Sequence, residues 1–161
     1  MEIRKATLQD LNNQMEVLNH AKNFMRSVGN SSQWVNGYPS AEVIMNDIAN
    51  GNSYVCIDKE NNIVGTFCFF QGEEPNYTFI EKGEWLNEHP YGVVHRLASN
   101  GTIKGVGAYC LEWCYAQCPN IRVDTHQENS VMQSLLKKNG FIPCGIIYVS
   151  DGTPRIAFQK C

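Results

Sequence analysis

A strand that turns through glycines into a helix constrains this 161-residue chain more than any other feature. The apolar run 93–98 ends in a short polar loop, and Lys104-Gly105-Val106-Gly107 then leads into a segment with helical periodicity. The first N–H groups of such a helix lack partners and the helix dipole is positive there, so the segment favours an anion, with pyrophosphate as the expected one. Glycine at 105 and 107 lets a ligand approach the backbone with no Cβ in the way.

The common phosphate-binding patterns do not fit this segment. A P-loop places four residues between its first glycine and Gly-Lys-Ser/Thr, whereas three residues separate Gly101 from Gly105 and Val106 follows. The dinucleotide fingerprint fails because Cys110 stands where its third glycine belongs. The alternative to a phosphate site is a glycine turn that only lets the helix pack closely on a sheet.

Composition indicates one domain spanning residues 1–161. The 43% hydrophobic and 18% charged residues are typical of a globular protein. The net charge of −3 provides no basic field, so neither nucleic acid nor a membrane surface is an expected partner. The N-terminus lacks the apolar segment of a signal peptide and no apolar run approaches a membrane span, so we expect a cytoplasmic protein.

Seven cysteines, an odd number, occur mostly in apolar segments, which favours buried free thiols over disulfides. Cys110, Cys114 and Cys118 share one helix face, a spacing that raises the question of a metal site. They also belong to a continuous apolar stripe and do not follow the usual Cys-x2-Cys spacing of zinc ligands. We therefore expect core residues here and no metal.

Hydrophobic periodicity predicts the element order β-α-α-β-β-β-α-β-α-β-β. Thr7-Leu8-Gln9-Asp10 is a capping-box pattern before the first helix, and Ser40 caps the second. The long polar segment 71–90 is expected as a loop with one extra strand near 77–80. The fold class is therefore α/β (α+β), a mixed sheet with helices on both faces. The strands are expected at 3–6, 54–57, 63–70, 93–98, 121–124, 141–149 and 155–158, and the later helices from about 104 to 117 and from 129. The last helix is expected to face inward with Val131, Met132, Leu135 and Leu136.

This order resembles the GNAT family of acetyl-CoA-dependent N-acetyltransferases over nearly the whole chain. Lys104-Gly105-Val106-Gly107 is similar to the end of the family's acetyl-CoA motif, Gln/Arg-x-x-Gly-x-Gly/Ala. Asn129, followed by the segment 135–141 ending in Gly-Phe, resembles the family's Asn-containing helix, and 3–7 resembles its first strand. The resemblance implies a mostly antiparallel sheet, and an acetyl-CoA co-substrate without a metal.

The resemblance also implies where acetyl-CoA binds. In such enzymes the fourth and fifth strands diverge, and the pantetheine arm lies in the gap. Leu97 and Ala98 would then contact it through their backbones, and Asn129 would bond toward it, although Asn129 equally suits capping its own helix. The pyrophosphate is expected on the backbone N–H groups of Thr102, Ile103, Lys104, Gly105, Val106, Gly107 and Ala108.

Two positions depart from the family pattern. Thr102 stands where the motif has Gln or Arg, which removes a side-chain contact and leaves the backbone amides in place. Leu136 stands where many members have a tyrosine that protonates the departing thiolate. The general acid is therefore elsewhere or is replaced by solvent.

The general base for amine deprotonation has several candidates. His95 lies in the strand that leads to the glycine turn, and its neutral form suits a base, although a structural role in the sheet is equally consistent. Asp124 ends the next strand and is the second choice. The remaining candidates are His126, Glu84 and Glu88.

The acceptor pocket is expected to be aromatic. Trp34 and Tyr38 stand in the loop between the first two helices, and Trp85, with Tyr91, follows later. Their rings would face a cationic amine, and the acidic segment 73–88 would favour one. The expected acceptor is a small-molecule amine or a peptide N-terminus, and a homodimer is possible. The alternatives are a silent acyl-CoA-binding or sensing module of the same fold, and an unrelated nucleotide-binding protein.

Overall fold

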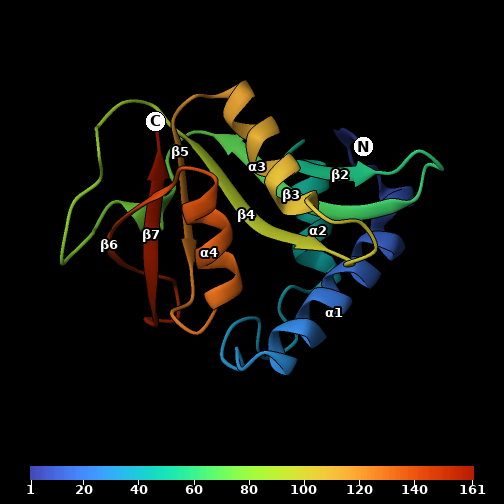
Figure 1. Ribbon diagram of the computed structural model, residues 1–161, viewed down its shortest axis with the longest axis horizontal. Coiled ribbons are helices and arrows are strands. Elements are labelled where there is room, and N and C mark those ends of the chain that lie inside the picture. The colour runs from blue at the N-terminus through green and yellow to red at the C-terminus, as the bar shows by residue number, and fades with distance from the viewer.

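The computed structural model describes all 161 residues and places seven strands and four α-helices in the expected order (Figure 1). The strands are β1 (Glu2–Lys5), β2 (Ser53–Ile57), β3 (Ile63–Gln71), β4 (Gly92–Ser99), β5 (Ile121–Thr125), β6 (Ile142–Tyr148) and β7 (Pro154–Lys160). The helices are α1 (Leu11–Ser27), α2 (Ala41–Ala49), α3 (Val106–Gln117) and α4 (Ser130–Lys138).

All strands form one sheet in the order β1-β2-β3-β4-β5-β7-β6. Every neighbouring pair is antiparallel except β4 and β5, which are parallel and are connected through α3. The prediction of a mixed, mostly antiparallel sheet is confirmed. Strand β7 inserts between β5 and β6, so the last strand of the chain lies beside the strand that borders the site.

Helices cover both faces of this sheet, as predicted. Residues of α3 and α4, including Leu111 and Leu136, pack in a core with Phe67 of β3. Residues of α1 and α2, including Leu18 and Ile44, form a separate core. In Figure 1, α3 and α4 lie in front of the sheet and α2 lies behind it. None of the four helices has both the length and the apolar character needed to cross a lipid bilayer.

The cysteine stripe of α3 packs into the core of the protein. Cys110, Cys114 and Cys118 are all buried in the same cluster as Phe67, which confirms the core interpretation of their spacing. Burial raises the pKa of the Cys114 thiol, so it stays protonated and unreactive at neutral pH. Of the seven cysteines, Cys161 alone is exposed, and all seven are free.

Three local predictions were wrong. Helix α3 begins at Val106 and not at Lys104, because Gly105 adopts a left-handed conformation with φ of 84°. The segment near residues 77–80 is not a strand: a 3₁₀ turn spans Pro75–Tyr77, and only a single bridge, Glu81 to Ile146, follows. Val131, expected on the inner face of α4, is largely exposed.

The predicted capping box fixes the chain between β1 and α1. The Asp10 carboxylate accepts a hydrogen bond from the Thr7 N–H at 2.8 Å and two from the Arg4 guanidinium at 2.8 and 2.9 Å. The hydrogen bond from Arg4 outweighs the effect of burial and lowers the pKa of Asp10. The carboxylate is therefore charged and fully paired at neutral pH.

Asp10→Asn is expected to lower the free energy of unfolding by about 1–2 kcal/mol at pH 7, because it removes the ion pair with Arg4 and keeps an acceptor for the Thr7 N–H. The folded-state pKa of Asp10 is depressed, so its contribution is present above the ordinary carboxylate pKa and is lost as the pH falls through the lowered value. Urea unfolding of both proteins at neutral and strongly acidic pH measures this. A deficit that stays the same at both pH values would contradict the ionic explanation.

Candidate functional site

The site forms where β4 and β5 separate. The two strands pair only at Gly92–Ile121 and Val93–Arg122, although β4 continues to Ser99 and β5 to Thr125. From Val94 onward the edge of β4 that faces β5 therefore lacks a strand partner. The gap expected from the sequence resemblance lies here.

A β-bulge bends β4 beside this gap. Arg96 and Leu97 together stand opposite Phe67 of β3, so β4 carries one extra residue. Within the bulge Arg96 takes a left-handed conformation, with φ of 53°. Its side chain consequently turns toward α2, where two guanidinium nitrogens contact the Asp47 carboxylate at 2.7–3.0 Å.

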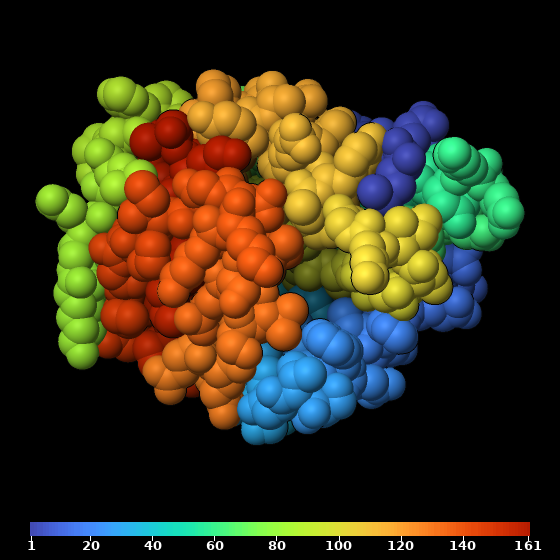
Figure 2. All heavy atoms as spheres, in the orientation of Figure 1, coloured from blue at the N-terminus to red at the C-terminus, as the bar shows by residue number.

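One cavity, of about 530 Å³, lies on the α4 side of the gap. Figure 2 shows the hollow between α4, the loop before α3 and α1. Its walls are largely apolar, and Gly107 sits so close to Leu135 of α4 that a Cβ would approach the leucine side chain to 2.8 Å. We call it the donor cavity; Leu97, Ala98, Ile103, Lys104, Gly107 and Asn129 line it.

Unpaired backbone amides border the donor cavity. The N–H groups of residues 103–108 donate to no protein acceptor. The Thr102 N–H is different, because it donates to the Asn100 Oδ1 at 3.1 Å and is therefore already committed. Gly105 is exposed, and a Cβ built on it meets nothing within 4 Å. The arrangement is an anion cradle that opens to the outside at Gly105.

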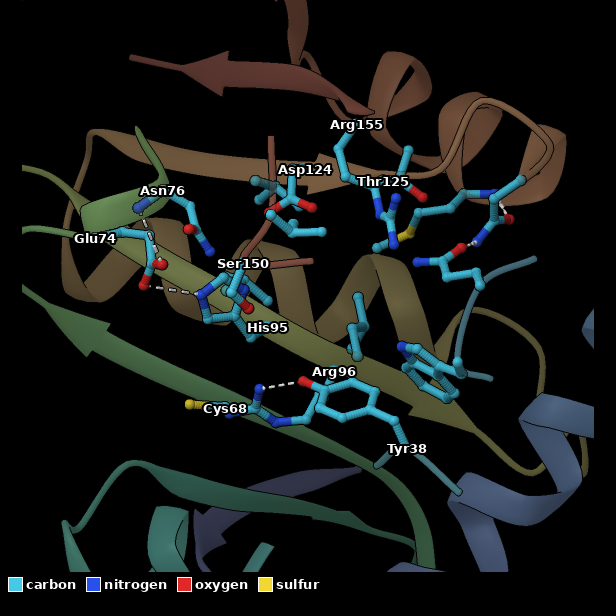
Figure 3. Close-up of a pocket in the computed structure, with 18 of the residues that line it drawn as sticks. Tyr38, Cys68, Glu74, Asn76, His95, Arg96, Asp124, Thr125, Ser150 and Arg155 are labelled. Atoms are coloured by element: carbon cyan, nitrogen blue, oxygen red, sulfur yellow. Dashed lines mark hydrogen bonds and ion pairs between the residues drawn. The ribbon is translucent and has the colours of Figure 1, made fainter. Parts of the chain in front are cut away.

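A second cavity, of about 550 Å³, lies across the gap and is far more polar (Figure 3). We call it the acceptor cavity. Met25, Leu97, Asn129 and Met132 line both cavities, so the two meet at the point where β4 and β5 part. Its polar side chains come from β4, β5 and β7, from α2 with the loops on either side of it, from the segment after β3, from the β6–β7 turn and from the cap of α4.

His95 and Glu74 form one polar pair in the acceptor cavity. The His95 Nε2 lies 3.3 Å from the Glu74 Oε2, and both side chains are mostly buried. The hydrogen bond from His95 lowers the pKa of Glu74, so Glu74 is ionised at neutral pH. An ionised carboxylate at Nε2 favours the tautomer with the proton there and leaves the Nδ1 lone pair free. His95 Nδ1 makes no hydrogen bond within the protein.

Asp124 and Tyr77 form the second pair. The Tyr77 hydroxyl donates to the Asp124 Oδ2 at 2.6 Å, and the Tyr77 ring centroid lies 6.2 Å from that of His95. Burial raises the pKa of Tyr77 well above its ordinary value, so the phenol remains a donor. Tyr77 thus connects the two predicted catalytic residues, which lie on opposite sides of the gap.

The loop between α1 and α2 closes the cavity. Trp34 is buried and Tyr38 is partly exposed, and both line the acceptor cavity. The Arg96 Nη1 donates to the Tyr38 hydroxyl at 2.8 Å while the rest of its guanidinium pairs with Asp47. The bulge in β4 therefore also orients an aromatic side chain of this loop (Figure 3).

Several sequence-predicted residues lie elsewhere. Trp85 does not line the acceptor cavity: its Nε1 donates to the Tyr77 carbonyl at 2.9 Å, and Arg122 stacks 4.2 Å from its ring centre. Glu84 and Glu88 are exposed outside both cavities. His126 also lies outside them, with its Nδ1 accepting from the Glu128 N–H. An aromatic or acidic residue in a polar segment looks the same in the sequence whether it lines a cavity or lies outside one.

Asn129 and Leu136 have defined places in the fold. The Asn129 Oδ1 accepts from the Met132 N–H at 3.0 Å, which is the capping role, while its Nδ2 donates to the Gln33 Oε1 at the border of both cavities. Leu136 is completely buried in the core of the sheet. No phenol therefore reaches the gap from this position of α4.

Sequence reasoning missed Glu74, Tyr77 and Arg155 as site residues. Glu74 appeared only as one of several acids in a polar segment, and it alone of those acids lines the cavity. Arg155 of β7 carried no signal, because a single arginine in a short strand is ordinary. All three enter the site through loops and strand pairing that bring distant segments together.

Comparisons with solved structures identify the fold. An acetyltransferase of the GNAT family from Streptococcus agalactiae is 32% identical, with a TM-score of 0.89 over 99% of this chain and 94% of that one. A GNAT-family acetyltransferase from Listeria monocytogenes has a TM-score of 0.72 at 16% identity, over 99% and 93% of the two chains. A NatC complex bound to Gag peptide and CoA has a TM-score of 0.59 at 15% identity, over 99% and 98%.

No protein-family model and no curated protein matches the sequence. The assignment comes instead from the Streptococcus structure, whose identity of 32% extends over nearly the full length of both chains. The parted β4 and β5 and the glycine turn into α3, both implied by the sequence resemblance, agree with it. The chain belongs to the GNAT family of acetyltransferases.

Proposed function

We propose that the protein is an acetyl-CoA-dependent N-acetyltransferase that transfers an acetyl group to a primary amine by direct attack on the bound thioester. The observation that carries this is the meeting of two unlike cavities at the β4–β5 gap. One offers unpaired amides and apolar walls, and the other offers a histidine–carboxylate pair. A thioester held in the gap would thus be reached by an amine from the opposite side.

The donor cavity fits acetyl-CoA through its backbone. Pyrophosphate oxygens suit the unpaired N–H groups of residues 103–108, which need no side chain to bind an anion. The pantetheine amides suit the open edge of β4 near Leu97 and Ala98, where β5 supplies no partner. The Thr102 N–H is not available to the pyrophosphate, because it already donates to Asn100. Asn129 contributes by fixing the start of α4 beside Gln33.

The chemistry requires a neutral amine and a stabilised oxyanion. His95 Nδ1 accepts the ammonium proton, directly or through water, while Asp124 holds the amine by its carboxylate. The amine nitrogen then forms a bond to the acetyl carbon as the carbon–sulfur bond breaks. The backbone N–H of Leu97, which faces the open edge of β4, is the donor proposed for the oxyanion. The nitrogen releases its second proton to solvent as the amide forms, and the leaving thiolate takes a proton from solvent, since Leu136 supplies none.

Turnover tests this proposal directly. Purified protein is incubated with acetyl-CoA and a panel of amines and peptides, and release of free CoA is followed together with the mass of the acetylated product. We expect CoA release that depends on the amine. The alternative, a silent acyl-CoA-binding or sensing module, predicts tight acetyl-CoA binding with no release for any acceptor. An unrelated nucleotide-binding protein predicts that ATP or NAD competes better than CoA.

A further inference from the structure

Three charged residues that line the acceptor cavity have no ion-pair partner: Asp124, Asp151 and Arg155. Asp151 is exposed, and its Oδ1 accepts hydrogen bonds from the Thr153 N–H and Oγ1 at 2.9 and 2.6 Å. Arg96 is matched by Asp47 at 2.7 Å, and His95 by Glu74 at 3.3 Å. Arg155 is the one cation lining the cavity that has no ion-pair partner. Asp124, with Tyr77 as its only hydrogen-bond partner, is the unneutralised carboxylate on the strand beside Arg155.

The guanidinium of Arg155 is oriented with one edge left free. Its Nη1 donates to the Thr153 Oγ1 at 3.0 Å and to the Pro154 carbonyl at 2.8 Å, which ties it to the β6–β7 turn. Nε and Nη2 have no protein acceptor. These two N–H groups form the edge that binds a carboxylate through two parallel hydrogen bonds. Figure 3 shows the side chain extending from β7 into the cavity.

Strand register places Arg155 close to Asp124. Asp124 of β5 stands directly opposite Ala157 of β7, and Arg155 is two residues away on β7. Residues in this diagonal relation share one face of the sheet and are about 7–8 Å apart. An unmatched anion and an unmatched cation thus lie side by side in one cavity, at a spacing that a small molecule bridges. Thr125 lines the same cavity, and its buried Oγ1 has no partner within the protein.

We infer that the acceptor is an amino carboxylate, a small amine that carries a carboxylate a few bonds away, as an α-amino acid does. Its ammonium group lies against Asp124, within reach of His95, and its carboxylate lies on the free edge of Arg155. A polyamine fits worse, because it would bring a second positive charge to Arg155. This inference rests on the proposed transferase function and specifies its acceptor.

The test compares matched acceptors and matched variants. Initial rates are measured for a series of amino acids and for the corresponding carboxamides, which keep the amine and lose the negative charge. Arg155→Gln is expected to lower kcat/KM for the amino acids about 30- to 100-fold and for the carboxamides less than about threefold. Arg155→Lys is expected to restore part of the loss, since it keeps the charge without the two-pronged geometry.

Lys160→Gln is the matched control, because Lys160 is a cation of the same strand that lies over Tyr115, outside the acceptor cavity. It should leave both acceptor classes unchanged. Taking the variant-to-wild-type ratio for each acceptor removes the difference in amine basicity between acids and amides. An equal loss for acids and carboxamides in Arg155→Gln would overturn the inference, and so would a wild-type enzyme that turns over carboxamides as well as acids.

These failures differ from failure of the proposed function. In both of them the protein still acetylates amines, so the transferase function stands and only the acceptor class is wrong. If acetyl-CoA binds and no amine of either class is acetylated, the transferase function itself fails, and the inference falls with it.

Discussion

Gly105→Glu is expected to abolish acetyl-CoA binding, raising its Kd about 100-fold or more. Gly105 lies where unpaired N–H groups surround the start of α3, and a Cβ there meets nothing within 4 Å. The new carboxylate would therefore lie on the cradle, accept hydrogen bonds from the same amides and repel the pyrophosphate. Calorimetric titration with acetyl-CoA measures the loss.

Gly152→Glu separates this effect from backbone strain. Gly152 has φ of 83°, nearly the 84° of Gly105, and also has open space around its Cβ position. It lies in the β6–β7 turn, away from the unpaired N–H groups at the start of α3. Gly152→Glu should bind acetyl-CoA as the wild type does, and circular dichroism should show both variants folded. Wild-type affinity in Gly105→Glu would instead leave the glycine turn as a packing feature only.

Much of the fold was predictable because the spacing of hydrophobic residues along each helix and strand shows which of its faces is buried. The stripe of α3 that contains Cys110 and Cys114, and the caps at Asp10 and Ser40, are local signals, and the structure confirms them. The bulge at Arg96 and the insertion of β7 between β5 and β6 depend on strand pairing. Pairing is decided by packing of the whole sheet, so no window of sequence encodes it.

The site was predictable only in part, for the same reason. His95 and Asp124 were singled out by their places in β4 and β5, and both line the acceptor cavity. Their partners are far away along the chain: Glu74 precedes His95 by 21 residues, and Tyr77 precedes Asp124 by 47. Trp85 is the opposite case, a residue predicted for the site that lies outside it. Its position in a polar segment favoured a pocket role, whereas its ring packs in a small core behind the cavity.

Replacing His95 by alanine is expected to lower kcat about 100- to 1,000-fold, with little change in the Kd of acetyl-CoA. The Glu74 carboxylate holds His95 by Nε2, so Nδ1 is the free basic nitrogen in the acceptor cavity. Without it the amine must lose its proton to solvent, and the acidic limb of the kcat/KM pH profile should change shape. Steady-state rates over a range of pH measure both effects.

Glu74→Gln tests the same pair from the other side and identifies Glu74 as a positioning residue. It keeps the side-chain volume and removes the charge that fixes the tautomer of His95. We expect kcat to fall about tenfold, because a neutral amide no longer fixes the His95 proton on Nε2. His89→Ala, an exposed histidine outside both cavities, is the control and should leave the rate unchanged. An unaltered rate and profile in His95→Ala would remove His95 from the mechanism and leave Asp124, bound to Tyr77, as the base that remains in the cavity.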